Sequence, residues 1–260
     1  GVGGGMELLQ FSYFSRQVGG VTGVDTVDEM LEASKNNFKI AESENDWFKS
    51  EYVNLVKGDA LNLPVEDESI DVAAQNCLFN IFKIEDLKRA VSEMYRVLKP
   101  HGRLVMSDPT CEQPMGDALR NDDRLRALCL SGSIPIKDYV KVLTDAGFGT
   151  IEIRARKSYR VLSPNHYPTD ELIHIESIEI AAIKDPMPSD GPCIFTGKTA
   201  IYYGDSEYFD DQKGHVLLQN QPLAVCDKTA DALGRASDEI HISESTWHYK
   251  IGRASCRERV

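Results

Sequence analysis

Residues 87–106 read LKRAVSEMYRVLKPHGRLVM, and this stretch decides the fold class. Its first part predicts an amphipathic helix, because apolar residues recur at helical spacing. Pro100 stops that helix, and Gly102 relieves the turn into a short apolar strand at 103–106. A helix that passes through a tight turn into a strand is the repeating unit of an α/β domain. The apolar positions of the helix are Leu87, Ala90, Val91, Met94, Val97 and Leu98.

The same alternation extends outward from this stretch over residues 1–156. We predict strands at 21–25, 52–56, 70–75, 103–106 and 150–155, and helices at 6–17, 27–43, 83–98, 117–130 and 136–146. Strands and helices that alternate at this spacing predict a mostly parallel sheet with helices on both faces. Pro- and Gly-rich breakers and short β-rich stretches replace the pattern near residue 185. We therefore predict an α/β domain at 1–156, a connecting segment at 157–184 and a small mixed α+β domain at 185–250.

Composition restricts the partners. The chain has 29 basic and 41 acidic side chains, a net charge of -12 and a pI of about 5.0. A field of that sign repels phosphate backbones and anionic lipid, so we expect neither nucleic acid nor membrane as a partner. No apolar run approaches the ~20 residues that span a bilayer. The six cysteines lie singly, without a Cys-x-x-Cys, which argues against a disulfide scaffold or a zinc ribbon and favours a reducing cytoplasm.

Both ends of the chain predict a fragment. The chain opens on the glycine-rich stretch 1–5 without an initiator methionine, and such a loop normally follows a buried strand. We therefore expect the chain to begin inside its own ligand-binding loop, with the N-terminal strand missing. Residues 251–260, IGRASCRERV, resemble the in-frame translation of a sequencing adapter and are left out of the fold prediction.

Glycines and acids at strand ends predict a cofactor site. Glycines let a ligand approach the backbone, and the helix that follows the loop offers free N–H groups to it. Asp25 lies 20 residues after Gly5, at the end of the next strand, where an acid can accept ribose hydroxyls. The turn 58–60 follows the third strand in the same way. A glycine loop alone is also typical of tight turns, but this combination favours a nucleoside-type cofactor.

Two cysteines are candidates for chemistry. Cys77 follows the strand 70–75 at its carboxyl end, where open α/β sheets bind ligands. Cys129 belongs to a different stretch, 128–134. A single cysteine is usually a small buried hydrophobic residue, so the residues alone leave packing and chemistry both open.

The stretch 89–104, together with Leu63-Pro64 and 67–71, resembles the helix–turn–strand signature of class I S-adenosylmethionine methyltransferases. The resemblance implies S-adenosylmethionine as methyl donor, with adenine near Asp59 and Ala60, ribose on Asp25 and the amino-acid end at the glycine loop. The cofactor-binding residues that we predict are Gly1, Gly3, Gly5, Asp25, Asp59, Ala60 and Asn76.

Residues 75–80, QNCLFN, are similar to the Asn-Cys-x-x-Asn element of arsenite methyltransferases. Cys129 and the following Gly132 resemble a second cysteine element of that family, and 225–230 resembles an element of its C-terminal region. The segments 47–50 and 107–111 extend the likeness, which reaches to Tyr249, to a bacterial branch linked to arsenosugar biosynthesis. The resemblance implies that Cys77 and Cys129 are the catalytic, arsenic-binding pair, with a third cysteine ahead of this fragment.

The chemistry of arsenic agrees with such a site. Trivalent arsenic is soft, so thiolates outcompete water and carboxylates for it. Three thiolates leave its lone pair exposed, and that lone pair can displace the sulfonium methyl in line without a general base. Proximity and alignment can supply ~7–11 kcal/mol of the rate. The implied partners are arsenite and methylated arsenicals, with thioredoxin or glutathione as thiol reductant.

Two other functions stay open. A methyltransferase that acts on carbon, oxygen or nitrogen would need a base, and Asp108 or His101 would have to provide it. A non-catalytic thiol module that sequesters arsenic would need the cysteines but neither Asp25 nor the glycine loop. Cys193 and Cys226 stay open between core packing and arsenic binding, and no oligomeric state is predicted.

Overall fold

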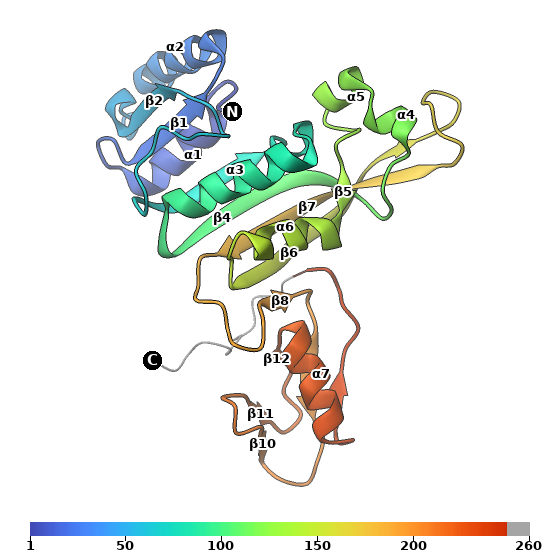
Figure 1. Ribbon diagram of the computed structural model, residues 1–260. Coiled ribbons are helices and arrows are strands. Elements are labelled where there is room, and N and C mark those ends of the chain that lie inside the picture. Colours follow the sequence, from blue (N-terminus) through green and yellow to red (C-terminus); the bar gives the residue numbers. More distant parts are fainter. Residues whose placement is uncertain (249–260) are drawn as a thin grey trace.

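A computed structural model describes residues 1–248 and places a long central sheet between two smaller units (Figure 1). The central sheet has the strand order β3-β4-β7-β6-β8, and β5 pairs with β4. The N-terminal unit lies beyond β3, and the C-terminal unit lies below β8 (Figure 1). The predicted adapter-derived segment 251–260 lies outside the described residues.

The N-terminal unit is built around a two-stranded parallel sheet. It comprises α1 (Met6–Ser15), β1 (Val21–Asp25), α2 (Asp28–Glu44), the short 3-10 turn Ser50–Tyr52 and β2 (Val53–Lys57). β1 and β2 pair in parallel from Val21↔Val53 to Asp25↔Lys57. Leu8, Leu31, Phe38 and Phe48 form its buried core. The order and type of these elements agree with the sequence prediction.

The central sheet is parallel except at one strand. Its elements are β3 (Ile70–Asn76), α3 (Ile84–Val97), β4 (Leu98–Cys111), β5 (Ile134–Pro135), α6 (Ile136–Asp145), β6 (Thr150–Leu162), β7 (Ile173–Ile183) and β8 (Cys193–Phe195). β3 and β5 run parallel to β4 and β8 runs parallel to β6, whereas β7 is antiparallel to both of its neighbours. The predicted turn after α3 is confirmed, since a Cβ on Gly102 would lie 2.8 Å from the Lys99 carbonyl oxygen.

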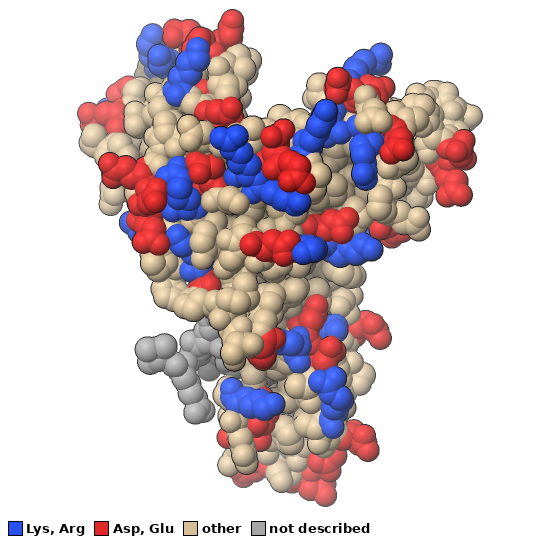
Figure 2. Space-filling model, in the orientation of Figure 1, with Lys and Arg blue, Asp and Glu red and all other residues tan. Residues whose placement is uncertain are grey.

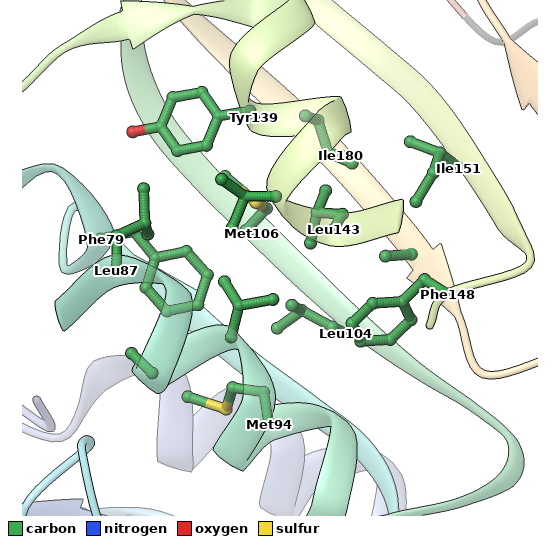
Figure 3. Close-up of a cluster of buried hydrophobic side chains, with 14 of the residues drawn as sticks. Phe79, Leu87, Met94, Leu104, Met106, Tyr139, Leu143, Phe148, Ile151 and Ile180 are labelled. Carbon is green, nitrogen blue, oxygen red and sulfur yellow. The ribbon is translucent and has the colours of Figure 1, made fainter. Parts of the chain in front are cut away.

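Helices α3 and α6 cover one face of this sheet and bury the main hydrophobic core (Figure 3). Leu104 and Met106 of β4 meet Leu87 of α3 and Leu143 of α6 there, together with Ile180 of β7. Burial of each large apolar side chain stabilises the fold by about 1.5–3 kcal/mol. The helical spacing in 87–98 therefore correctly predicted which face of α3 is buried.

The structure places residues 157–184 differently from the sequence prediction of a connecting segment. They form the second half of β6 and all of β7, which are hydrogen-bonded side by side in the middle of the sheet. Charged side chains interrupt the alternation of apolar and polar residues along β6. They are paired across strands, as Arg156 is with Glu176 and Lys157 with Glu179.

The predicted helix 117–130 is wrong in its extent. The structure has two short helices there, α4 (Asp117–Arg120) and α5 (Asp123–Ala127). The break falls at Asp122, whose carboxylate accepts a hydrogen bond from the Leu125 N–H at 3.0 Å and so begins a new helix.

The C-terminal unit has its own small sheet and one helix, as predicted for a mixed α+β domain. Its elements are β9 (Thr199–Tyr202), β10 (Tyr208–Asp210), β11 (Val216–Leu218), β12 (Leu223–Ala224), α7 (Asp227–Ala236) and β13 (Ile240–Ile242). β12, β9 and β13 form an antiparallel sheet, and β10 pairs with β11. Tyr202, Val225 and Leu233 lie in a core separate from the main one.

Charged side chains of both signs lie on the surface of the molecule. On the face shown in Figure 2, acidic side chains are interspersed with basic ones, and no continuous basic patch appears on that face. Among residues 1–248, no helix has both the length and the apolar character needed to cross a membrane.

Candidate functional site

Predicted cofactor residues follow the carboxyl ends of three parallel strands. Asp25 is the last residue of β1, Asp59 follows β2, and Asn76 is the last residue of β3. The Asn76 amide donates a hydrogen bond to the Glu7 carboxylate in the first turn of α1 at 3.3 Å. This contact brings the end of β3 next to the glycine loop. No sequence pattern singles out Glu7.

Asp25 holds the glycine loop against β1. Its side chain is only 8% exposed, and its two oxygens accept hydrogen bonds from the Val2 N–H at 2.7 Å and the Val27 N–H at 2.9 Å. A carboxylate oxygen can accept more than one hydrogen bond, so ribose hydroxyls still fit the predicted role. The structure adds a second role, because Asp25 also shapes the loop.

The glycine loop has free space for a Cβ atom at Gly3 but none at Gly5. Gly3 and Gly5 have φ angles of 52° and 85°, which favour glycine. A Cβ at Gly3 would meet nothing within 4 Å, whereas one at Gly5 would lie 2.7 Å from Phe38. A Cβ at Gly1 would lie 3.5 Å from the Asp25 carboxylate. The loop therefore offers exposed backbone at Gly3, which fits a cofactor cradle.

The turn after β2 exposes the Asp59 side chain. One Asp59 carboxylate oxygen accepts the Leu61 N–H at 2.9 Å, and its carbonyl accepts the Asn62 N–H at 3.0 Å. Ala60 is half-buried between them. These contacts fix the turn and leave the second carboxylate oxygen for a ligand, as an adenine amino group would require.

The structure brings Cys77 and Cys129 together across 52 residues. The Cys129 thiol donates a hydrogen bond to the Cys77 carbonyl oxygen at 3.3 Å. Both residues have left-handed backbone angles, with φ of 53° and 58°. Such angles are uncommon outside glycine and occur at functional sites. Cys77 is exposed and Cys129 half-buried, so the pair lies at the surface next to the end of β3.

Asn80 and Gly132 fasten the two cysteine loops to each other. The buried Asn80 side chain donates a hydrogen bond to the Cys129 carbonyl oxygen at 2.8 Å. A Cβ at Gly132 would lie 1.5 Å from the Asn80 carbonyl oxygen, so only glycine fits there. The second asparagine of the QNCLFN element is thus a structural link between the loops.

Asp108 holds the loop that carries Cys77 through hydrogen bonds from the protein interior. It is fully buried in β4 and accepts hydrogen bonds from the Gln75 side chain and from the Asn80 N–H. Burial raises the pKa of Asp108 to about 7, although hydrogen bonds from Gln75, Asn80 and Phe79 work against that rise. Asp108 is therefore a positioning residue for the cysteine loop.

The surroundings of the two thiols keep them protonated at neutral pH. Burial raises the pKa of Cys77 to about 11, and the nearby Cys129 and Asp108 add to the rise. Burial and the Asp108 charge also raise the pKa of Cys129, while its hydrogen bond with Cys77 lowers it. An acidic site of this kind does not activate thiolates by itself, so a reaction partner has to take up the thiol protons.

His101 lies at the opposite end of the sheet. Its ring contacts the Asp185 carboxylate at 2.7 Å, in the part of β4 where the pairing with β3 shifts register between Leu98 and Arg103. Cys77 adjoins Ser107, about 20 Å further along that strand at ~3.3 Å per residue. Within residues 1–248, no group of three or more histidine, cysteine or acidic side chains is arranged to hold a metal ion.

Comparisons with known proteins agree with this geometry. A family model described as a methyltransferase domain matches residues 1–106. An arsenite methyltransferase of Halobacterium salinarum is 31% identical over 153 residues, 59% of this chain and 37% of that protein. The arsenite methyltransferase of Aquipseudomonas alcaligenes is 29% identical over 57% of this chain and 42% of its own length. The arsenite methyltransferase of Mus musculus is 25% identical over 76% of this chain and 48% of its own length. The chain thus spans less than half the length of these relatives.

Two solved structures share the fold. An arsenic(III) S-adenosylmethionine methyltransferase from Chlamydomonas reinhardtii superposes with a TM-score of 0.64 at 22% identity, over 96% of this chain and 85% of that one. The YcgJ protein of Bacillus subtilis superposes with a TM-score of 0.55 at 20% identity, over 71% of this chain and 89% of that one.

The fold is that of the class I S-adenosylmethionine-dependent methyltransferases. Within that fold, the chain is similar in sequence to arsenite methyltransferases over 57–76% of its length, in agreement with the resemblance around Cys77. The link to arsenosugar biosynthesis remains a prediction.

Proposed function

We propose that this chain transfers a methyl group from S-adenosylmethionine to trivalent arsenic held by Cys77 and Cys129. One observation carries the proposal: the Cys129 thiol contacts the main chain of Cys77 at the end of β3, next to the glycine loop predicted to hold the cofactor. The homology to arsenite methyltransferases supports the choice of arsenic as substrate.

Arsenite can react with protonated thiols. Each thiol replaces one hydroxyl group of As(OH)₃, so an As–S bond forms, an As–O bond breaks and the thiol proton leaves with the hydroxyl as water. This exchange needs no external base, which suits the raised pKa values of Cys77 and Cys129. Two sulfurs and a third hydroxyl or thiol ligand leave the arsenic lone pair exposed.

The residues around the glycine loop fit S-adenosylmethionine, which when bound supplies an electrophilic methyl group. Gly3 offers open backbone, Asp25 retains lone pairs for the ribose, and Asp59 has an exposed carboxylate oxygen. The methyl group would pass to the arsenic lone pair, and the donor sulfur would keep the electron pair of the carbon–sulfur bond. Arsenic becomes pentavalent, and a thiol reductant such as thioredoxin or glutathione returns it to the trivalent state by supplying two electrons and forming a disulfide.

The position of the titratable groups disfavours methylation of carbon, oxygen or nitrogen. Such substrates need a general base. His101 lies about 20 Å along the strand from Cys77, and Asp108 is buried with both oxygens engaged by the Cys77 loop. Attack by an arsenic lone pair requires neither residue as a base.

The test is methylation of arsenite by the full-length protein with a thiol and S-adenosylmethionine, read as methylated arsenic by mass. We expect product from the unsubstituted protein and none above background from Asp25→Ala, which should still bind arsenite at its thiols. Methylation that survives Asp25→Ala would contradict the proposed cofactor site. Arsenite binding without methylation in the unsubstituted protein would instead favour a sequestering thiol module.

A further inference from the structure

A second pair of cysteines lies in the C-terminal part of the molecule. Cys193 begins β8 and Cys226 precedes α7, 33 residues further along the chain. Cys193 is 7% exposed and Cys226 fully buried, and both pack with Phe195 in one small cluster. The fold has therefore brought these two cysteines into one buried cluster.

The first turn of α7 places a polar group next to the Cys226 sulfur. Cys226 occupies the N-cap position of this ten-residue helix, and its thiol lies 3.2 Å from the Thr229 hydroxyl. The positive end of a helix dipole favours a thiolate at this place. At Cys77 and Cys129, by contrast, burial and the negative charge of Asp108 both raise the pKa.

Lys228 supplies a positive charge to both sulfurs. Burial works to lower the pKa of Lys228, but a hydrogen bond to Asp190 and negative charge at Cys193 and Cys226 raise it overall. Its ammonium contacts the Asp190 carboxylate and donates to the Gly191 carbonyl oxygen at 2.6 Å. Lys228 thereby ties the surface turn at 190–191 over the cysteine cluster.

This cluster is separate from the site at Cys77. Strands β4, β7 and β6 lie between β3 and β8, which makes a lateral distance of about 19 Å at ~4.8 Å per strand. Cys193 is level with Thr150, Ile183 and Arg103, whereas Asn76 is level with Ser107. One arsenic atom cannot bridge sites at this separation.

The number of thiols selects the ligand. Trivalent monomethylarsenic carries one carbon substituent, so two thiolates complete its three bonds. We propose that Cys193 and Cys226 form a second site, which binds trivalent monomethylarsenic as a dithiolate. Two As–S bonds replace two As–OH bonds and release two waters, and arsenic stays trivalent. The choice of ligand rests on the proposed function, because monomethylarsenic is the reduced product of the first methyl transfer.

Native mass spectrometry tests this site without any turnover. The protein is the reduced full chain with Cys77→Ser, Cys129→Ser and Cys256→Ser, and the probe is monomethylarsonous acid. We expect one CH₃As unit per chain, bound with loss of two hydrogens. Additional Cys193→Ala or Cys226→Ala should weaken binding at least ~100-fold, since a single thiol loses the effective concentration of the second. Cys111→Ala, at a buried cysteine outside the cluster, should leave the adduct intact.

A labelling experiment covers the case in which a variant fails to fold. In the unsubstituted chain, monomethylarsonous acid should protect both Cys193 and Cys226 from N-ethylmaleimide, as mapped on peptides. A reduced chain that takes up no arsenical, or an adduct that maps to Cys111, would overturn the proposal. The adduct does not depend on methyl transfer, so an inactive enzyme that still forms it would refute the proposed function and leave this site standing.

Discussion

The two cysteine pairs of this chain have opposite surroundings. Cys77 and Cys129 lie at the surface on left-handed loop residues, where partial burial, and then the charge of Asp108, raise the pKa of both thiols. Cys193 and Cys226 lie in the interior, at a helix N-terminus and near a lysine. The first environment suits exchange with a ligand that carries its own hydroxyl groups. The second places a helix N-terminus and a lysine near the sulfurs and shields what they bind. On the two proposals, the same residue type serves methyl transfer in one place and retention in another.

The largest effect is expected from Cys77→Ser, which tests whether the surface pair performs the chemistry. A serine hydroxyl is a hard, weak ligand for arsenic. Loss of a group that only supports a metal ligand already costs up to ~100-fold, so loss of the ligand itself should lower arsenite methylation by more than ~100-fold. The assay is methylated arsenic by mass. Cys111→Ala is the matched control, because this buried cysteine only donates to the Ser133 carbonyl oxygen. Near-normal methylation by Cys77→Ser would remove the distinction between the pairs.

Gly132→Ala should break the surface pair without touching a sulfur. The added Cβ would collide with the Asn80 carbonyl oxygen at 1.5 Å, and backbone on both sides would have to move. We expect a loss of about 3 kcal/mol in the free energy of unfolding. Gly116→Ala is the control, since its Cβ would meet nothing within 4 Å and should change stability by less than about 0.5 kcal/mol. Equal effects of the two substitutions in urea unfolding would contradict the loop contact.

Asp108→Asn sharpens the electrostatic part of the comparison. The native pKa of about 7 lies above the unfolded value of ~3.9, so the native state binds the Asp108 proton more tightly. This contribution to stability is complete below pH ~4 and is lost as the pH rises through about 7. The Asn variant should therefore show a flatter decline in unfolding free energy between pH 4 and 7, as measured by urea unfolding at several pH values.

The same substitution should change the surface thiols and spare the buried pair. Loss of the negative charge lowers the pKa of Cys77 and Cys129, so both should react several-fold faster with iodoacetamide at pH 8. Labelling of Cys193 and Cys226 should stay as it was. Unchanged labelling of Cys77 would mean that Asp108 does not act on the thiol.

The smallest effect is expected from Lys228→Gln, which opens the cover of the interior pair. The Lys228 side chain is 26% exposed and Asp190 71% exposed, so loss of this ion pair should cost less than about 1 kcal/mol. N-ethylmaleimide should nevertheless label Cys193 and Cys226 several-fold faster. Lys213→Gln, on another exposed turn of the same unit, serves as the control. Identical labelling rates would show that the turn at 190–191 does not limit access.

Local patterns predicted most of the α/β elements and the strand ends at which several candidate residues lie. The helical spacing in 87–98 and the turn at Pro100 identified α3 and β4, and strand ends placed Asp25 and Asn76 correctly. The choice of Cys129 as the partner of Cys77 came from family elements, because nothing local to either residue indicates a contact across 52 residues.

What the sequence could not provide depends on contacts between distant segments. The β6–β7 pair was missed because charged residues such as Arg156 interrupt the apolar alternation, and their partners, including Glu176, lie on another strand. Asp108 could be weighed only as a base or a cap, since its hydrogen bonds with Gln75 and Asn80 require β3 and β4 to be adjacent. The pairing of Cys193 with Cys226 likewise arises only when α7 packs against β8.

Strand β8 makes the C-terminal unit inseparable from the rest of the molecule. Its three residues precede the small sheet in sequence, yet they pair in parallel with β6 of the central sheet. A chain cut ahead of Cys193 would leave β6 as an open edge with unpaired backbone groups, which are a template for aggregation. Domain exchange between homologues should therefore place its junctions after Phe195, so that each central sheet keeps its own last strand.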